Sequence, residues 1–262
     1  MGKVLAVVNQ KGGVGKSTTA VNLGACLAEL GQKVLIVDLD PQGNASSGLG
    51  IDKTKLEASI YQVLLEEMQL EEVIQKTAIP NLSVVPATIA LAGAEVELVS
   101  GISREMRLKV ALGELKEEFN TILIDCPPSL GLLTLNALAA SHGALVPIQC
   151  EYYALEGLGQ LIKTLDLVRK HLNPTLEVSG VVLTMYDART NLSQQVIAEV
   201  RKFFSDKVFQ TIIPRNVKLS EAPSFGQPII LYDDRSRGAQ AYRDLAREFC
   251  GLPIQGGVAS NE

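Results

Sequence analysis

The 262-residue sequence has few of the side chains on which several classes of enzyme depend. It has no tryptophan and two histidines, His142 and His171, which lie far apart in the chain. Metalloenzymes and Ser-His-Asp hydrolases need histidine in a defined spacing or triad, so the sequence disfavours both classes. We expect each histidine to be a surface or capping residue.

The four cysteines are also widely spaced, and no two of them form a CxxC pair. Such cysteines are typical of free, buried thiols in a reducing compartment, which favours a cytoplasmic protein. They are Cys26, Cys126, Cys150 and Cys250.

Long hydrophobic runs are missing as well. No apolar stretch reaches the roughly 18 residues that a membrane span requires. Met1-Gly2-Lys3 leads into a brief apolar segment and then into glycines, so we expect no signal peptide. The sequence therefore predicts neither a membrane-spanning nor a secreted protein.

Positive charge is scarce in the first part of the chain. The formal net charge is −5; residues 1–150 carry 11 basic and 16 acidic side chains, and residues 151–262 carry 13 of each. An acidic chain is not an obvious nucleic-acid binder by net charge. Any DNA contact would need a local basic face in the second half.

What the sequence does contain is ordinary globular composition, 47% hydrophobic and 20% charged, with short β-branched runs that alternate with amphipathic stretches. The runs are almost continuously apolar, as is typical of strands buried on both faces of a parallel sheet. Seven segments have this character, at residues 3–8, 33–37, 82–85, 121–125, 143–148, 178–184 and 208–212. The helical stretches between them cover residues 17–30, 104–119, 130–140, 154–171, 192–204 and 236–249.

This rhythm predicts an α/β fold, a doubly wound and mostly parallel sheet with helices on both faces. We find no internal repeat and no low-complexity linker, so we expect one domain over residues 1–250. Residues 42–100 are the least regular part. Residues 251–262 are small and polar and are expected to form a flexible tail.

A glycine-rich segment at residues 9–19, Asn-Gln-Lys-Gly-Gly-Val-Gly-Lys-Ser-Thr-Thr, follows the first strand and opens the first helix. That context is typical of a phosphate-binding loop, in which backbone N–H groups and the helix N-terminus face anionic oxygens. Lys16 would reach the β- and γ-phosphates, and the Ser17 hydroxyl would ligate Mg²⁺. The sequence therefore predicts a P-loop NTPase.

The loop departs from the general GxxxxGK[ST] pattern because Gln10 stands where the first glycine would be, and a second lysine, Lys11, follows it. This resembles the deviant Walker A motif of the ParA/MinD superfamily of dimeric ATPases. The resemblance implies that Lys11 crosses a dimer interface to the other subunit's nucleotide, and that Gly12 permits a close approach of two backbones. It implies that the nucleotide contacts Lys11, Gly12, Gly13, Val14, Gly15, Lys16, Ser17 and Thr18.

Carboxylates follow two of the predicted strands. Asp38 and Asp40 follow the second strand, where alternation would send both side chains toward the phosphates, although a turn cap at Asp40-Pro41 is the alternative. Asp125 ends a later apolar strand and matches a Walker B strand. The resemblance implies that Asp40 orients the attacking water, with Lys11 and Lys16 as the other catalytic residues. It also implies that Asp38 and Asp125 support the metal with Ser17.

Further segments are similar to the ParA/Soj branch, which partitions chromosomes and plasmids. They lie at residues 40–45, 125–129, 149–157 and 213–223, so the resemblance covers residues 1 to about 250. In that branch Pro214 and Asn216 would lie beside the adenine, where a proline ring can pack on the base and an amide can read its edge.

Three related branches fit less well. The mixed charge of residues 241–250 is unlike the basic membrane helix of MinD-like proteins. No second cysteine is placed to share a cluster with Cys126, as nitrogenase-reductase-like proteins require. The ten residues before Lys11 leave no room for the helix-turn-helix domain of larger plasmid ATPases, so we expect none.

The resemblance thus implies an ATPase that hydrolyses ATP to ADP and phosphate with Mg²⁺. Its ATP-bound sandwich dimer would bind the nucleoid's double-stranded DNA without sequence preference, until a ParB/Spo0J-like partner stimulates hydrolysis. Candidate DNA contacts are Arg189, Lys218 and Arg215. The rival interpretations are a membrane-surface positioning ATPase and a small-molecule kinase or synthetase that uses the same loop.

Overall fold

An eight-stranded sheet runs through the molecule. The computed structural model describes residues 2–151 and 158–254. The strands lie in the order β3-β4-β2-β5-β1-β6-β7-β8, and β3 alone runs antiparallel to its neighbour among them. Their bounds are β1 (Lys3–Val7), β2 (Val34–Asp38), β3 (Gln75–Lys76), β4 (Leu82–Val85), β5 (Thr121–Asp125), β6 (Gly143–Gln149), β7 (Glu177–Tyr186) and β8 (Val208–Pro214).

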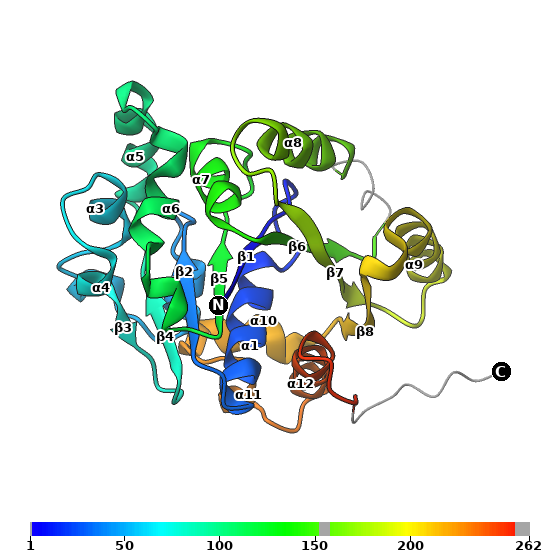
Figure 1. The fold of residues 1–262 in the computed structure, drawn as a ribbon. Coiled ribbons are helices and arrows are strands. Elements are labelled where there is room, and N and C mark those ends of the chain that lie inside the picture. The colour runs from blue at the N-terminus through cyan, green and yellow to red at the C-terminus, as the bar shows by residue number, and fades with distance from the viewer. Residues whose placement is uncertain (1, 152–157, 255–262) are drawn as a thin grey trace.

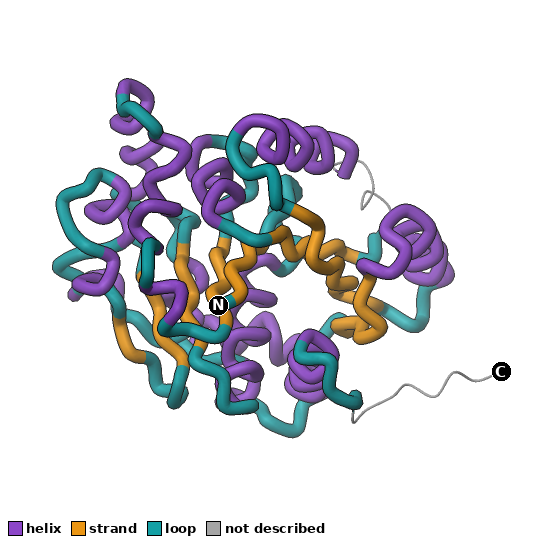
Figure 2. Tube along the Cα trace, viewed as in Figure 1, coloured by secondary structure: helices purple, strands orange, loops and turns teal. Residues whose placement is uncertain are grey.

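Helices cover both faces of this sheet, with α7 and α8 on one side and α1 and α12 on the other (Figure 1). Figure 2 shows the strands in the centre between the two helical layers. The helices are α1 (Lys16–Glu29), α2 (Asn44–Gly48), α3 (Ile60–Leu64), α4 (Leu70–Val73), α5 (Leu91–Glu97), α6 (Arg107–Leu112), α7 (Leu132–Ala140), α8 (Leu158–His171), α9 (Asn191–Phe204), α10 (Val217–Glu221), α11 (Ile229–Tyr232) and α12 (Arg237–Phe249).

The alternation of side chains along β1 shows how the two cores are divided. Val4 and Ala6 belong to one buried apolar cluster, and Leu5 and Val7 belong to the other. Successive side chains of a strand point to opposite faces, so a central strand must be apolar at every position to serve both cores. The predicted doubly wound sheet and all seven predicted strands are confirmed.

The sequence prediction differs from the structure in several places, and it did not include α10 and α11. It missed β3, because a two-residue antiparallel strand at the sheet edge leaves no periodic pattern. It also joined residues 104–119 into one helix, whereas α6 covers Arg107–Leu112 and has a 3₁₀ turn on either side. The chain turns at Gly113, whose φ of 34° lies outside the helical region and ends the helix.

Two further predictions fall partly outside the described residues. Of the helix predicted at 154–171, residues 158–171 are described and are helical, and residues 154–157 lie outside. Of the predicted tail, residues 255–262 lie outside, and its separation from the domain stays a prediction. In the described part of the chain, no helix has the length and apolarity needed to cross a membrane.

Candidate nucleotide-binding site

The residues predicted to bind the phosphates and the metal lie at or just after the carboxyl ends of three adjacent strands. In the order β2-β5-β1, Asp38 is paired in register with Asp125, and Asp125 is paired with Val7. The chain leaves β1 at Val7 and enters the glycine-rich loop. The sheet therefore brings together two carboxylates and a loop that are far apart in the sequence, at the edge where open α/β sheets bind ligands.

The glycine-rich loop has a backbone that leaves the start of α1 open. Gly13 and Gly15 adopt left-handed conformations, with φ of 73° and 88°, which side chains with a Cβ disfavour. Gly15 is the N-cap of α1, and no side chain caps this helix end. The first N–H groups of α1 are therefore available to an anionic ligand, with the positive end of the helix dipole behind them.

Side chains from the neighbouring strands fix this loop in place. The Asn9 amide donates to the Pro147 carbonyl of β6 at 2.7 Å, and its oxygen accepts from the Lys11 N–H at 3.0 Å. Farther along, the Thr184 hydroxyl at the end of β7 donates to the Val14 carbonyl at 2.9 Å. The loop is thus held in shape by β6 and β7 on the side away from β5.

Lys16 lies at the bottom of the loop. Its ammonium donates to the Lys11 carbonyl at 3.2 Å, and the residue is only 7% exposed. Burial lowers the pKa of Lys16, and the negative charges of Asp125 and Asp40 oppose this shift. A cation held between a loop carbonyl and two carboxylates is well placed to receive phosphate oxygens.

A cleft of about 530 Å³ opens over the loop. A volume of this size suits a small ligand of nucleotide class. The lining combines the start of α1, the loop after β2 and the segment after α10. Its residues are Gly12, Gly13, Gly15, Lys16, Ser17, Thr18, Val21, Asn22, Asp40, Gln42, Asn44, Ser47, Gly48, Pro128, Met185, Pro223, Ser224 and Gln227.

Asp125 is the most unusual carboxylate of the site. It is fully buried, and among the described residues neither of its oxygens has a partner within hydrogen-bonding geometry. Burial raises its pKa well above the usual range, the neighbouring Asp38 raises it further, and the nearby Ser17 hydroxyl lowers it. A buried carboxylate without a donor, beside a hydroxyl, fits a divalent cation with oxygen ligands.

No cluster of three or more histidine, cysteine or acidic side chains is placed to hold a metal in residues 2–151 and 158–254. A cation at Asp125 and Ser17 would therefore take most of its ligands from water and phosphate. That arrangement is typical of Mg²⁺, which keeps several waters in nucleotide sites.

Asp38 has different surroundings. Its carboxylate accepts from the Ser46 N–H at 2.7 Å, from the Ser46 hydroxyl at 2.6 Å and from the Asp40 N–H at 3.2 Å. Burial raises the pKa of Asp38 to about 6, although these hydrogen bonds oppose the shift. Neither Asp38 nor Asp125 is among the described residues that line the cleft, but hydrogen bonds already satisfy the Asp38 carboxylate, which favours a positioning role over direct metal ligation.

Asp40 does line the cleft. Strand β2 ends at Asp38, so Asp40 lies in the following loop, where strand alternation does not by itself set the direction of a side chain. Asp40 accepts from the Gln42 N–H at 2.9 Å, and the Lys53 ammonium donates to the Gln42 carbonyl at 2.7 Å. The loop is thus held at both sides of residue 41, and Asp40 is only 6% exposed.

A second cavity of about 390 Å³ adjoins the first and shares Gly15, Thr18, Met185 and Pro223 with it. Both predicted base-contacting residues, Pro214 and Asn216, line this cavity. Its remaining lining residues are Thr184, Ile213, Arg215, Val217, Leu219, Ser220 and Tyr242.

One polar group of Asn216 has no hydrogen-bond partner among the described residues. Its carbonyl oxygen accepts from the Lys218 N–H at 2.8 Å and caps α10. The side-chain NH₂ is thus the part of Asn216 that could donate to a base.

Lys11 is not among the described residues that line either cavity of its own chain. Its carbonyl supports Lys16, and its side chain is half-buried. The extra lysine therefore does not complete the cleft within a single copy.

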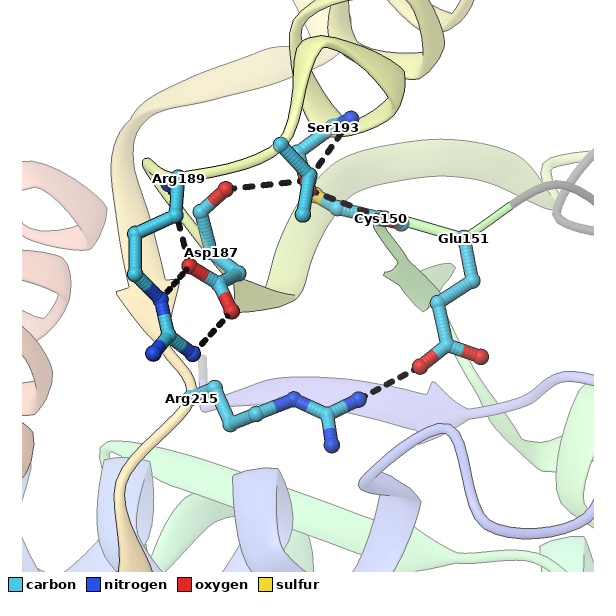
Figure 3. Close-up of polar contacts among 7 residues, drawn as sticks. Cys150, Glu151, Asp187, Arg189, Ser193 and Arg215 are labelled. Carbon is cyan, nitrogen blue, oxygen red and sulfur yellow. Dashed lines mark hydrogen bonds and ion pairs between the residues drawn. The ribbon is translucent and has the colours of Figure 1, made fainter.

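The three candidate DNA contacts all form ion pairs with acidic neighbours. Arg189 makes a two-pronged contact with Asp187, at 2.9 and 2.6 Å, and Arg215 pairs with Glu151 (Figure 3). Lys218 pairs with Glu221 at 3.0 Å. All three side chains are well exposed, and such surface pairs are weak, so they can be exchanged for phosphate contacts.

Sequence reasoning missed several residues of the site. Thr184 and Met185 come from the end of β7, and Tyr242 of α12 lines the second cavity while its hydroxyl lies 3.3 Å from that of Thr19. No local motif marks them. The only available signal was general, since ligand-binding residues gather at the carboxyl ends of parallel strands.

Comparisons with known proteins agree with this geometry. Residues 2–178 match a family model described as an AAA domain. The chain is 63% identical over 248 residues to the sporulation initiation inhibitor protein Soj of Bacillus subtilis, which covers 95% of this chain and 98% of the relative. It is 56% identical over 248 residues to the chromosome partitioning protein ParA of Myxococcus xanthus, and this match covers 95% of this chain and 88% of the relative.

One solved structure shares both fold and sequence. Cobyrinic acid a,c-diamide synthase from Mycobacterium smegmatis, with bound ADP and magnesium, is 40% identical with a TM-score of 0.83, over 98% of this chain and 100% of that one. The fold and the cleft define a P-loop nucleotide-binding protein. More narrowly, the chain belongs to the ParA/Soj family of chromosome-partitioning ATPases.

Proposed function

We propose that ATP and Mg²⁺ drive this ATPase into a dimer that binds double-stranded DNA without sequence preference, and that hydrolysis releases the DNA. The observation that carries the proposal is the pair of adjoining cavities, one over the phosphate loop and one at Pro214 and Asn216. Together they suit the phosphates and the base of one nucleotide. The protein would act in the cytoplasm, on the nucleoid.

Lys16 and the loop residues from Gly12 to Thr18 would hold the phosphates. Their support is the uncapped start of α1 and the buried position of the Lys16 ammonium. Pro214 would pack on the adenine, and the free NH₂ of Asn216 would donate to its edge.

Ser17 and Asp125 would hold the magnesium ion, with Asp38 as a positioning residue that fixes the loop after β2. When bound, the ion would neutralise negative charge on the phosphates. The unpartnered carboxylate of Asp125 supports this assignment, because a buried carboxylate is stabilised by a cation.

Asp40 would orient the water that attacks the terminal phosphate. Its position on the cleft wall, in a loop held by Lys53, supports that role. Lys11 would reach the nucleotide of the other subunit and place positive charge where the transferring phosphoryl group becomes more negative. Its absence from the lining of its own cleft is consistent with action in trans.

Arg189, Lys218 and Arg215 would contact DNA phosphates after exchanging their acidic partners. Such contacts carry no sequence information and weaken steeply with salt. Dimerisation doubles the number of contacts and hence the avidity. The partner that stimulates hydrolysis would be a ParB/Spo0J-like DNA-binding protein, as expected for a relative of the partitioning proteins.

A second candidate function has one observation in its favour. The solved structure at 40% identity is named as a synthase that acts on a small molecule. An enzyme of that kind would release phosphate only when its acceptor is present. The higher identity to the partitioning proteins favours the first function.

The decisive experiment measures duplex-DNA binding by Asp40→Ala protein with ATP and with ADP, across a salt series. We expect tight, sequence-indifferent, salt-sensitive binding with ATP alone, because this variant would keep its ATP. Lys16→Ala is the control that should lose nucleotide binding, and DNA binding with it, by about a hundredfold or more.

Equal or absent DNA binding in both nucleotide states would contradict the proposal. An Asp40→Ala variant that hydrolyses ATP at the wild-type rate would remove the role given to Asp40. A small molecule that accelerates phosphate release by the wild-type protein would favour the synthase instead.

A further inference from the structure

Met185 stands where the two cavities meet. It is one of the four residues that line both, and it is the only one of them that comes from the sheet, at the end of β7. Gly15 and Thr18 belong to the phosphate loop and α1, and Pro223 belongs to the segment after α10. A ligand that fills both cavities would therefore lie against Met185.

The backbone of Met185 has an unusual conformation. Its φ is 53°, in the left-handed region that a residue with a Cβ seldom adopts. The pairing of β7 with β8 also loses its regular register between Leu183 and Tyr186. A conformation of this kind costs free energy and persists only where the surroundings hold it in place, which is common at ligand-binding positions.

The surroundings of Met185 do hold it, from both sides. Before it, the Thr184 hydroxyl donates to the Val14 carbonyl of the phosphate loop at 2.9 Å, and the Thr184 carbonyl accepts from the Cys150 N–H at 2.9 Å. After it, the Tyr186 carbonyl accepts from the Arg215 N–H at 2.9 Å. Arg215 lies between Pro214 and Asn216, so Met185 is anchored to the phosphate loop on one side and to the base loop on the other.

From this arrangement we propose that Met185 is a specificity-determining residue for the nucleotide. Its side chain forms the wall that the phosphate and base cavities share, and it packs against the sugar and base of the ligand but not against the phosphates. This inference rests on the proposed nucleotide site. It adds a residue from β7 that selects a whole nucleotide over a phosphate chain alone.

The chemistry of the side chain suits this position. A methionine side chain is unbranched and polarisable, so it can fit an irregular space beside a ring. It offers no strong hydrogen bond, so its contribution should come from apolar contact and should depend on its volume. Leucine has a similar volume and should replace it, whereas alanine should not.

The test compares two ligands, ADP and inorganic pyrophosphate, by calorimetric titration in the presence of magnesium. We expect Met185→Ala to weaken ADP binding by about tenfold and to leave pyrophosphate binding within about twofold. Met185→Leu should keep ADP binding within about threefold. The matched control is Met68→Ala, which truncates a half-buried methionine that lines neither cavity and should change neither affinity.

A second measurement tests the strained backbone. At an ordinary strand position, glycine gives a less stable protein than alanine. At Met185 the order should be reversed, because glycine adopts the left-handed conformation freely. We therefore expect Met185→Gly to melt at a higher temperature than Met185→Ala, although both should bind ADP weakly.

Three results would overturn the inference: unchanged ADP binding in Met185→Ala, equal weakening of both ligands, or a Gly variant less stable than the Ala variant. Failure of the proposed nucleotide site is distinguishable, because the wild-type protein would then bind neither ADP nor pyrophosphate. Wild-type binding of ADP together with an unaffected Met185→Ala variant would reject Met185 alone.

Discussion

At the scale of single residues, two neighbouring carboxylates show how surroundings decide a role. Asp38 and Asp125 are paired in register and both are fully buried. Asp38 has Ser46 as donor of two hydrogen bonds, whereas Asp125 has no partner in hydrogen-bonding geometry among the described residues. The protein thus satisfies the first carboxylate, whereas the second would be stabilised by the proposed magnesium ion.

This difference predicts a pH dependence. Because its folded-state pKa is raised, Asp125 binds a proton more readily in the folded than in the unfolded protein. Its contribution to stability is therefore present at low pH and is lost as the pH rises from about 4 upward. Without nucleotide or magnesium, the free energy of unfolding of wild-type protein minus that of Asp125→Asn should fall between pH 4 and pH 8.

Urea unfolding at a series of pH values measures this difference. Asp52→Asn is the control, because hydrogen bonds from Thr54 hold the pKa of that exposed carboxyl at about 2, below the range tested. Its difference from wild type should stay constant above pH 4. A constant difference for Asp125→Asn would show that folding does not raise the pKa of Asp125.

At the scale of elements, the loop between β2 and α2 depends on one glycine. Gly43 has φ of 61°, and a Cβ there would lie 2.8 Å from the Ala87 carbonyl oxygen and 2.7 Å from the Lys53 side chain. Lys53 is the residue that holds the Asp40 loop. Gly43→Ala should destabilise the protein by roughly 2–4 kcal/mol and should also lower ATP hydrolysis.

Thermal unfolding and phosphate release measure the two effects. Gly159→Ala is the matched control, because Gly159 lies in α8 at an ordinary φ, and no atom of the described residues lies within 4 Å of the added Cβ. That change should stabilise the protein by about 0.5–1 kcal/mol. If Gly43→Ala were as stable and as active as wild type, the loop would not need this conformation.

The arrangement of the elements also explains which features could be predicted from the sequence and which could not. The strands and the glycine-rich loop could be predicted because their signals are local: apolar runs, and glycines directly after a strand. The roles of Thr184 and Met185 could not, because they depend on β7 lying two places from β1 in the sheet. The position of Asp40 in a loop could not either, because it depends on β2 ending at Asp38.

At the scale of the whole molecule, a chain of net charge −5 would bind a polyanion. The three candidate contacts are each paired with an acidic side chain, so a single copy presents little free positive charge at these positions. Two copies side by side would present twice as many exchangeable cations. This makes assembly, rather than overall charge, the basis of the proposed DNA binding.

Gly12 provides a test of assembly. It has nothing within 4 Å of an added Cβ, and its φ is not in the left-handed region, so a single copy can accept alanine there. Gly12→Ala should change the free energy of unfolding by less than about 0.5 kcal/mol. It should nevertheless block ATP-dependent dimerisation and reduce ATP hydrolysis, since the proposed dimer would bring two backbones close together at this position.

Light scattering with ATP, together with phosphate release, measures this outcome. Gly159→Ala serves again as the control and should dimerise normally. A Gly12→Ala variant that dimerises like wild type would mean that the two copies do not meet at this loop.

Lys11 is not among the described residues that line its own cleft, and the proposed action of Lys11 on a second copy would make activity depend on protein concentration. If the lysine acts only on the nucleotide of a second copy, an isolated molecule would hydrolyse ATP slowly. The hydrolysis rate per molecule would then rise with the local density of other copies. Dilute protein would keep its ATP bound, whereas protein gathered on one stretch of chromosome would hydrolyse it. The position of one side chain would thus make the time that ATP stays bound depend on the local density of the protein.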